Sequence, residues 1–340
     1  MSRDQTIYSE LAVAIAINGG SIDGVINIDK ESKSAYRREL SRRSKSDLGK
    51  AKTKSLVSAG KLIGDHLAKK GVAKPVVKWT GTEKLGAGSS VAKDILISNA
   101  NLRISVKENA DVYINGSPER IFQMVPCGFF GQNARGEDWF FTTAELELDY
   151  YFLACGGNRI KGCKNTSDFY SLIERIQRKV FGEKVKALHD SNNSNVINAY
   201  KVLCEKVSNE SARIFNANLT NSLTANKRIL PEIFKFFFKL NSVEYILAGI
   251  EKNKPFAVLL MPIDRWIKKY EFMGVIALPL LKGQPEVLLR FSFRNKTDGT
   301  NFDLEARVEI RWSHGKFCGN PEAKVYKTWT YADLPWVSLV

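Results

Sequence analysis

Two short apolar runs on either side of a polar turn constrain the fold of this chain more than any other feature. Ile95-Leu96-Ile97 and Arg103-Ile104-Ser105-Val106-Lys107 have the residue types and spacing of β-strands, and residues 98–101 between them are typical of a turn. The sequence therefore predicts a β-hairpin. Because paired strands lie about 5 Å apart, a rigid hairpin would hold the side chains of Asp94 and Lys107 close together.

A carboxylate and a lysine in this arrangement are the smallest set of groups for metal-assisted phosphodiester hydrolysis. Asp94 would hold Mg²⁺, and Lys107 would orient or deprotonate a water and stabilise the charge on phosphorus. The alternative interpretation is structural, because an Asp and a Lys on neighbouring strands also form ordinary ion pairs at sheet edges.

The spacing of these residues resembles a known family. Asp94, ten further residues and then Ser105-Val106-Lys107 resemble the D…(D/E)xK core of the restriction-endonuclease-like nucleases, the PD-(D/E)xK superfamily. The resemblance covers about residues 75–125. It departs from the family pattern at Ser105, which stands where a second acid is expected.

One subgroup of restriction enzymes has S-x-K on this strand and takes the acid from the following helix. Ser117 and Pro118 predict the start of a helix, as N-cap and first-turn residues. Glu119 follows Lys107 by twelve positions, which fits this migrated-acid variant. The resemblance then implies Asp94 and Glu119 as ligands of Mg²⁺ or Mn²⁺, Lys107 as the catalytic lysine, and Ser105 as a filler or weak hydrogen-bond donor.

The resemblance implies a magnesium-dependent endonuclease whose substrate is double-stranded DNA. RNA cleavage would use the same chemistry. The main alternative is a noncatalytic nucleic-acid-binding protein or phage structural protein on a degenerate nuclease fold, with Ser105 marking an empty metal site. The C-terminal sequence motifs also resemble those of uncharacterised proteins of tailed phages, which favours a phage source. The expected location is then the cytoplasm of a bacterium or infected host cell. A homodimer is expected if both strands of a duplex are cut.

The distribution of charge favours a polyanionic partner. The chain has 51 Lys and Arg against 36 Asp and Glu, a net charge of +15, and residues 30–75 hold fourteen of these bases but only four acids. Such a segment attracts phosphate through counterion release, although a basic helix face is more often merely solvated. The side chains expected to bind nucleic acid here are Arg37, Arg38, Arg42, Arg43, Lys45, Lys50 and Lys54.

A second basic and aromatic segment lies near the C-terminus. Arg311, Lys316 and Lys324 alternate with aromatic residues that could stack on unpaired bases while the charges hold phosphates. We include these three side chains in the expected nucleic-acid-binding set.

The pattern of helix and strand signals predicts a mixed α/β protein in four consecutive parts. These are a basic helical arm (1–75), an endonuclease-like core (76–139), a helical region (140–252) and a β-rich region (253–340). Helices are expected over 47–70, 143–153, 167–188, 196–215 and 229–250, and C-terminal strands over 256–261, 275–281, 287–293 and 304–312.

Other signals exclude some classes of protein. No apolar run is long enough to span a bilayer, and residues 11–17 lack the features of a signal peptide, so no membrane partner is expected. Five cysteines without close pairs favour a reducing compartment. A zinc site built from Cys155, Cys163, His314 and Cys318 is an alternative to ordinary thiols.

Overall fold

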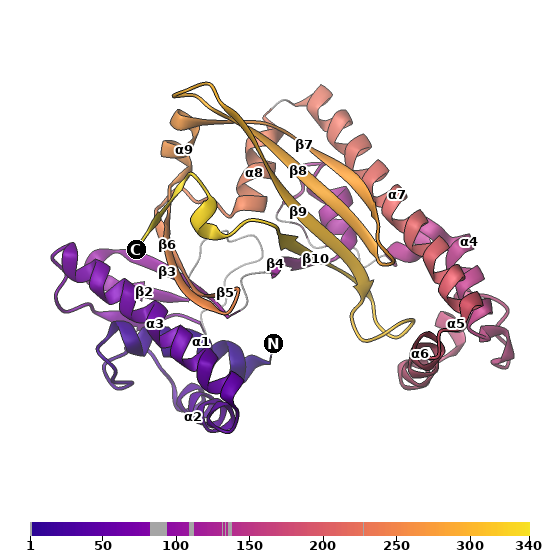
Figure 1. The fold of residues 1–340 in the computed structure, drawn as a ribbon, viewed down its shortest axis with the longest axis horizontal. Coiled ribbons are helices and arrows are strands. Elements are labelled where there is room, and N and C mark those ends of the chain that lie inside the picture. The colour runs from indigo at the N-terminus through magenta and orange to yellow at the C-terminus, as the bar shows by residue number, and fades with distance from the viewer. Residues whose placement is uncertain are drawn as a thin grey trace. The chain divides into compact units, whose positions relative to one another are not determined.

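The predicted mixed α/β class is confirmed by a computed structural model. It describes residues 2–81, 94–108, 112–130, 132, 134, 138–226 and 228–340. Figure 1 shows helices and strands along the chain, with strands gathered into two sheets. No helix in these described ranges is long and apolar enough to cross a membrane.

The bounds of the helices and strands are as follows, in chain order. The first half contains α1 (Arg3–Ile17), α2 (Lys30–Ser44), α3 (Asp47–Lys69), β1 (Val77–Trp79), β2 (Ile95–Ile97), η1 (Ser98–Ala100), β3 (Leu102–Lys107), β4 (Val112–Gly116), the π-helical turn η2 (Arg120–Met124), α4 (Trp139–Ala154), η3 (Gly157–Arg159) and α5 (Thr166–Leu172). The second half contains α6 (Arg175–Asp190), α7 (Ser194–Ala225), α8 (Ile229–Phe238), β5 (Tyr245–Glu251), β6 (Lys254–Leu260), α9 (Ile263–Lys269), β7 (Tyr270–Leu281), β8 (Pro285–Asn295), β9 (Asn301–Trp312), β10 (Pro321–Lys327), η4 (Tyr331–Asp333) and β11 (Val337–Leu339).

These elements form two compact units whose segments alternate along the chain. Unit 1 consists of Met1–Asp111, Phe238–Glu271 and Trp329–Val340, and unit 2 of Val112–Phe237 and Phe272–Thr328. The four consecutive parts expected from the sequence do not coincide with these units. The reason is long-range strand pairing, since β3 pairs with β5 in unit 1 and β4 pairs with β10 in unit 2.

Unit 1 is built on a six-stranded sheet in the order β1-β2-β3-β5-β6-β11. The first three strands form an antiparallel meander, β5 is parallel to β3, and β6 and β11 continue antiparallel. Parallel neighbours require a crossover, and here the connection from β3 to β5 contains the whole first segment of unit 2. The predicted hairpin is confirmed as β2 and β3, joined through η1.

Helices α1 and α3 pack on each other and against the sheet of unit 1 (Figure 1). Helix α1 begins with a capping box between Ser2 and Gln5, and helix α3 begins with Ser46 as its N-cap. Helix α1 is buried on nearly every side from residue 7 to residue 14, because its apolar run is continuous rather than confined to one stripe. Any polar side chain in that run is therefore carried into the core.

Unit 2 combines a five-stranded sheet, in the order β4-β10-β9-β8-β7, with helices α4 to α8. Helix α7 packs on β8 and on α4. The inner face of the sheet supplies alternating apolar residues, such as Val287, Leu289, Phe291 and Phe293 of β8.

Two of the expected helices are wrong in extent. The expected helix 229–250 ends with α8, and β5 follows, because residues 245–251 are all buried and pair with β3 and β6. The expected helix 167–188 is split into α5 and α6, since Ile173 and Glu174 have extended backbone conformations.

Candidate active site

The β2–β3 hairpin fixes the side chain of Asp94 from two directions. The Oγ of Ser105 donates a hydrogen bond to Asp94 Oδ2 at 3.0 Å, and the backbone N–H of Val106 donates to the same oxygen at 2.6 Å. No described residue donates a hydrogen bond to Oδ1. The hairpin therefore orients this carboxylate and leaves one of its oxygens available to a ligand.

Lys107 ends β3, and its backbone lies against an unusual glycine. Gly249 of β5 pairs with Lys107 and has a φ of +143°, and a Cβ at this position would lie 1.9 Å from the Lys107 carbonyl oxygen. Only glycine allows β5 to approach the end of β3 this closely. The backbone position of Lys107 thus depends on Gly249.

Glu10 is a carboxylate of this region that the sequence interpretation missed. It lies in the buried run of α1 and is 8% exposed, and its Oε2 accepts a hydrogen bond from Trp79 Nε1 at 2.8 Å. Burial, and next the charge of Asp94, raise the pKa of Glu10 to about 7, while Trp79 and Lys107 act in the opposite direction. The charge of Asp94 therefore disfavours ionisation of the buried Glu10.

Lys239 is a second lysine near these acids. It directly follows α8 with a left-handed φ of 51°, and its carbonyl oxygen accepts a hydrogen bond from the Tyr245 hydroxyl at 2.9 Å. Burial, and next the charge of Lys107, lower the pKa of Lys239 to about 7, and Asp94 opposes this shift. Burial, and next the charge of Asp94, raise the pKa of Tyr245. Lys107, Lys239 and Tyr245 thus share the electrostatic environment of Asp94.

A buried ion-pair network anchors the residue after Lys107. Glu108 accepts hydrogen bonds from Arg43 Nη2 and Ser9 Oγ, both at 2.6 Å, and Arg43 Nε also contacts Glu39 Oε1 at 2.7 Å. Burial alone would raise the pKa of Glu108, but the bonds from Arg43 and Ser9 hold it below its usual value. The network ties the end of β3 to α1 and α2.

Arg43 is therefore not an exposed phosphate-binding residue, and this expectation is wrong. Its side chain is only 3% exposed, and its guanidinium lies 4.5 Å from the centre of the Tyr8 ring. An arginine that is buried and bonded to two carboxylates cannot also reach a phosphate in solvent.

Glu119 does not lie in the same compact unit as the hairpin residues, so the structure does not support grouping it with them. Asp94, Ser105 and Lys107 belong to unit 1, whereas Glu119 belongs to unit 2. Glu119 is buried in front of η2, where the Ser117 hydroxyl accepts a hydrogen bond from the Arg120 N–H at 3.2 Å. Within unit 1, Glu10 is the acid whose charge couples to Asp94.

The donor set of unit 1 fits Mg²⁺ better than a structural metal such as zinc. In the described part of the chain no three His, Cys, Asp or Glu side chains are grouped as a metal cage. Mg²⁺ commonly uses one or two carboxylates together with waters and substrate phosphates. Glu10 and Asp94 each have one oxygen that receives no hydrogen bond from a described residue, so these two acids fit that pattern.

The same finding removes support for the Cys–His zinc alternative. Cys155, Cys163 and Cys318 are buried free thiols, and His314 is exposed. All four positions lie in the described ranges, which contain no group of three His, Cys, Asp or Glu side chains that could hold a metal ion. These three cysteines therefore pack as ordinary core residues.

The other predicted basic residues before β1 do form an exposed surface on α2, α3 and the connection between them. We call it the α2–α3 basic surface, and it consists of Arg37, Arg38, Arg42, Lys45, Lys50 and Lys54. Arg38, Arg42 and Lys50 form ion pairs with Asp4, Glu39 and Asp47, respectively, but their side chains are 60 to 62% exposed. Solvent weakens such pairs, so the surface remains able to exchange them for phosphate contacts.

The basic residues near the C-terminus, which were expected to bind nucleic acid, are already engaged in contacts within the protein. Arg311 and Lys324 both contact Glu322, at 2.8 Å and 3.5 Å, on a sheet face where Arg290 pairs with Glu305. Acidic and basic side chains alternate on this face, and these three basic side chains are already paired with acids.

Lys316 is also poorly suited to phosphate binding. Its Nζ lies 3.0 Å from the centre of the Tyr200 ring, and burial lowers its pKa to about 7. Arg311, Lys316 and Lys324 are therefore poorly placed for the phosphate binding expected of them.

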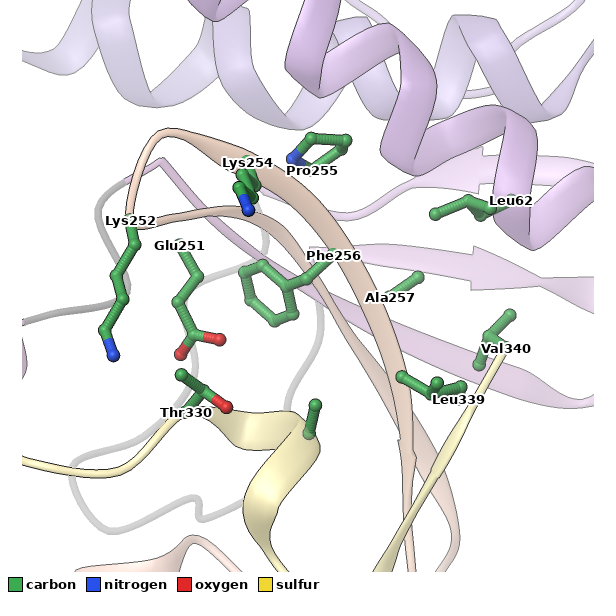
Figure 2. A pocket seen from close by; sticks show the side chains of 11 residues that line it. Leu62, Glu251, Lys252, Lys254, Pro255, Phe256, Ala257, Thr330, Leu339 and Val340 are labelled. Atoms are coloured by element: carbon green, nitrogen blue, oxygen red, sulfur yellow. The ribbon is translucent and has the colours of Figure 1, made fainter.

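A pocket of about 430 Å³ elsewhere in unit 1 has a different character. Figure 2 shows Leu62, Leu339 and Val340 near one another, and Glu251 beside Thr330. Both carboxylate oxygens of Glu251 accept from the Tyr331 N–H at 3.2 Å. Its mainly apolar lining does not fit a phosphodiester, so the acids near the hairpin remain the better candidate site.

Only a weak sequence signal marked the missed residues. Glu10 is the one charged residue of the run from Ile7 to Ile17, and a lone acid among apolar neighbours is either paired or functional. Lys239 follows the aromatic run of α8 and carried no comparable signal.

Comparisons with known proteins identify no relative: no family model, no curated protein and no solved structure matches this chain. The functional assignment therefore depends on the chemistry of the site itself.

Proposed function

We propose that this chain is a metal-dependent nuclease that hydrolyses phosphodiester bonds of DNA at the β2–β3 hairpin. The observation that carries the proposal is the Asp94 carboxylate, which hydrogen bonds of the hairpin orient, with the buried Glu10 and two lysines near enough for their charges to interact with it or with one another. Strongly perturbed acids and bases gathered in this way are typical of catalytic sites.

The two acids have the chemistry to hold a divalent cation. Glu10 and Asp94 would each offer their second oxygen, and the positive charge would offset both the burial of Glu10 and the repulsion from Asp94, which together raise its pKa. When bound, Mg²⁺ supplies Lewis-acid activation of the phosphate and a lowered pKa for a coordinated water. Glu10 takes the role that the sequence assigned to Glu119.

The remaining residues orient the reacting groups. Ser105 and the Val106 N–H fix the rotamer of Asp94, which keeps the carboxylate aimed in one direction. Lys107 orients the attacking water, and the ammonium of Lys239 stabilises negative charge on the phosphate in the transition state. Gly249 and the Glu108–Arg43 ion pair hold the end of β3 that bears Lys107.

The α2–α3 basic surface supports a nucleic acid as the substrate. It places six exposed basic side chains in the same unit as the acids. Phosphate contacts of this kind bind without regard to base sequence and weaken as salt rises. We favour double-stranded DNA as the substrate because that is the substrate implied by the nuclease resemblance, and the exposed basic side chains are compatible with it.

The test is cleavage of plasmid, linear duplex DNA, single-stranded DNA and RNA with Mg²⁺, Mn²⁺ or a chelator. Cleavage of duplex DNA that needs the metal and is lost in Glu10→Gln, Asp94→Asn and Lys107→Met would support the proposal. Glu119→Gln is the matched control, because it removes a buried carboxylate of unit 2 and should leave the rate within about threefold of wild type. Loss of cleavage in Glu119→Gln, with Glu10→Gln fully active, would restore the migrated-acid assignment.

A noncatalytic nucleic-acid-binding protein is the second candidate. Ser105 in place of an acid, and the lack of a three-residue metal cage in the described ranges, favour it. In that case the wild type would bind the panel and cut nothing, and the Asp94, Lys107 and Glu10 variants would bind equally well.

A further inference from the structure

Helix α4 of unit 2 is apolar on two opposite sides. Leu148, Tyr151 and Phe152 are fully buried on its inner side. On the outer side Leu146, Tyr150 and Leu153 are 80%, 48% and 42% exposed, at the i, i+4, i+7 spacing of one helical stripe. A helix with apolar residues on both sides is normally covered on both.

The next two helices continue this pattern. Leu172 at the end of α5, and Ile176 and Val180 of α6, are 59%, 77% and 64% exposed. The three helices share a buried aromatic cluster, in which the rings of Phe152, Phe169 and Phe181 lie 5.1 to 5.5 Å apart, centre to centre. The exposed side chains thus belong to helices that are packed together, and are not on a frayed end.

The concentration of these side chains is higher than elsewhere. Among the residues that the structure describes, twenty large apolar side chains are exposed, and six of them lie between residues 146 and 180. Single exposed apolar residues are ordinary, but a group of this kind usually marks an interaction surface. We call these six residues, with the helices α4 and α6 that carry most of them, the α4–α6 surface.

The charges on the two helices are opposite. Helix α4 has no Lys or Arg and three acids, Glu145, Glu147 and Asp149, which give it a net charge of −3. Helix α6 has five Lys and Arg against two acids, which give it a net charge of +3. A partner that fits α4 should be basic and apolar, and a partner that fits α6 should be acidic and apolar.

A second copy of the chain meets both requirements at once. We propose that this protein forms a two-fold symmetric dimer in which α4 of each copy packs on α6 of the other. In such an isologous interface every contact occurs twice, so each apolar stripe and each charged helix is matched by its complement. The six apolar side chains form the centre and the opposite charges form the rim, as in typical interfaces. The inference is independent of the nuclease proposal.

The first experiment measures the mass of the full chain by light scattering after size exclusion, from about 1 to 100 μM, a range that covers weak and moderate dimers. The expected wild-type mass is twice the chain mass of 38.2 kDa. Leu146→Glu and Val180→Glu should each give the single-chain mass, because a buried unpaired charge disrupts an apolar contact. Leu339→Glu, at a side chain of unit 1 that is 74% exposed, is the control and should remain dimeric.

A charge-reversal experiment tests which helices meet. The variant Glu145→Lys/Glu147→Lys makes α4 positive, and the variant Lys179→Glu/Lys184→Glu makes α6 negative, so each is expected to be monomeric alone. When the two variants are mixed, both α4–α6 contacts again join opposite charges, and a heterodimer should form. Glu145, Lys179 and Lys184 are exposed and Glu147 is partly exposed, so circular dichroism and thermal unfolding should match those of the wild type.

Three results would overturn the proposal. These are a wild-type chain that stays monomeric at 100 μM, a dimer that persists in both Leu146→Glu and Val180→Glu, and reversed variants that do not associate on mixing.

Discussion

Replacing Glu10 by Gln should stabilise the metal-free protein at neutral and higher pH, although it alters a buried residue. The amide of Gln has nearly the same shape as the carboxyl group, and its oxygen can still accept the hydrogen bond from Trp79 Nε1. The substitution removes only the charge, whose cost arises from burial and from the neighbouring Asp94.

The magnitude follows from the shifted pKa. The pKa of Glu10 is about 7 in the folded chain against 4.5 for the free group, and each pKa unit corresponds to about 1.4 kcal/mol. Since the folded-state pKa is raised, the wild type has its full stability below pH 4.5 and loses about 3 kcal/mol as pH rises through 7. Gln does not titrate, so the variant should be about 3 kcal/mol more stable than the wild type at pH 8 and equal to it at pH 4.

Thermal unfolding at several pH values in a chelator measures this difference. For a chain of 340 residues, an advantage of about 3 kcal/mol corresponds to a melting temperature higher by about 4 °C at pH 8, with no difference at pH 4. Excess Mg²⁺ should raise the melting temperature of the wild type at pH 8 but not that of Glu10→Gln, because only the wild type keeps both acids. A variant that is less stable than the wild type at pH 8, or equally shifted at both pH values, would refute this account of Glu10.

The other predictions concern the supports of the site. Arg43→Met should destabilise the protein by about 3 to 5 kcal/mol in urea unfolding at pH 7, because the buried Glu39 and Glu108 lose the buried arginine that bridges them and keep only partners that are more exposed; a loss below about 1 kcal/mol would contradict it. Gly249→Ala should cost roughly 3 kcal/mol in the same assay, through strain between β5 and β3. Lys239→Met should lower kcat on DNA by roughly 10²-fold with little change in KM, and Lys239→Arg should recover part of the rate. Lys45→Glu with Lys54→Glu should reduce the salt dependence of DNA binding by about two units of slope, and an unchanged slope would place the DNA elsewhere.

Local features of the fold could be predicted from the sequence. The β2–β3 hairpin was predictable because its register depends on adjacent residues and a short turn. The helix over 47–70 was also predictable, since its apolar face repeats with helical spacing and Ser46 caps it. Strand β5 was not, because it is buried along its whole length and lacks the alternation that identifies a half-exposed strand.

The composition of the site was less predictable than its hairpin. Asp94, Ser105 and Lys107 belong to one local motif, but Glu10 reaches it from a helix more than eighty residues earlier in the chain. Lys239 comes from a position more than one hundred and thirty residues after Lys107. Without related sequences, no local pattern reports such long-range neighbours. Arg43 illustrates the opposite error, since a charge run does not reveal which of its members is buried.

The parallel pairing of β3 with β5 also determines when the sheet of unit 1 can be completed during synthesis. The ribosome completes the β1–β2–β3 meander early, and must then add residues 108–244 before the partner of β3 begins to emerge. At 5 to 20 residues per second this takes on the order of ten seconds, during which the Lys107 edge of the meander has no neighbour. A chain interrupted in this interval contains Asp94 and Lys107 but lacks Lys239, Tyr245 and Gly249. The candidate site is therefore complete only in chains that have passed residue 249, which would delay the proposed hydrolysis until most of the protein has been made.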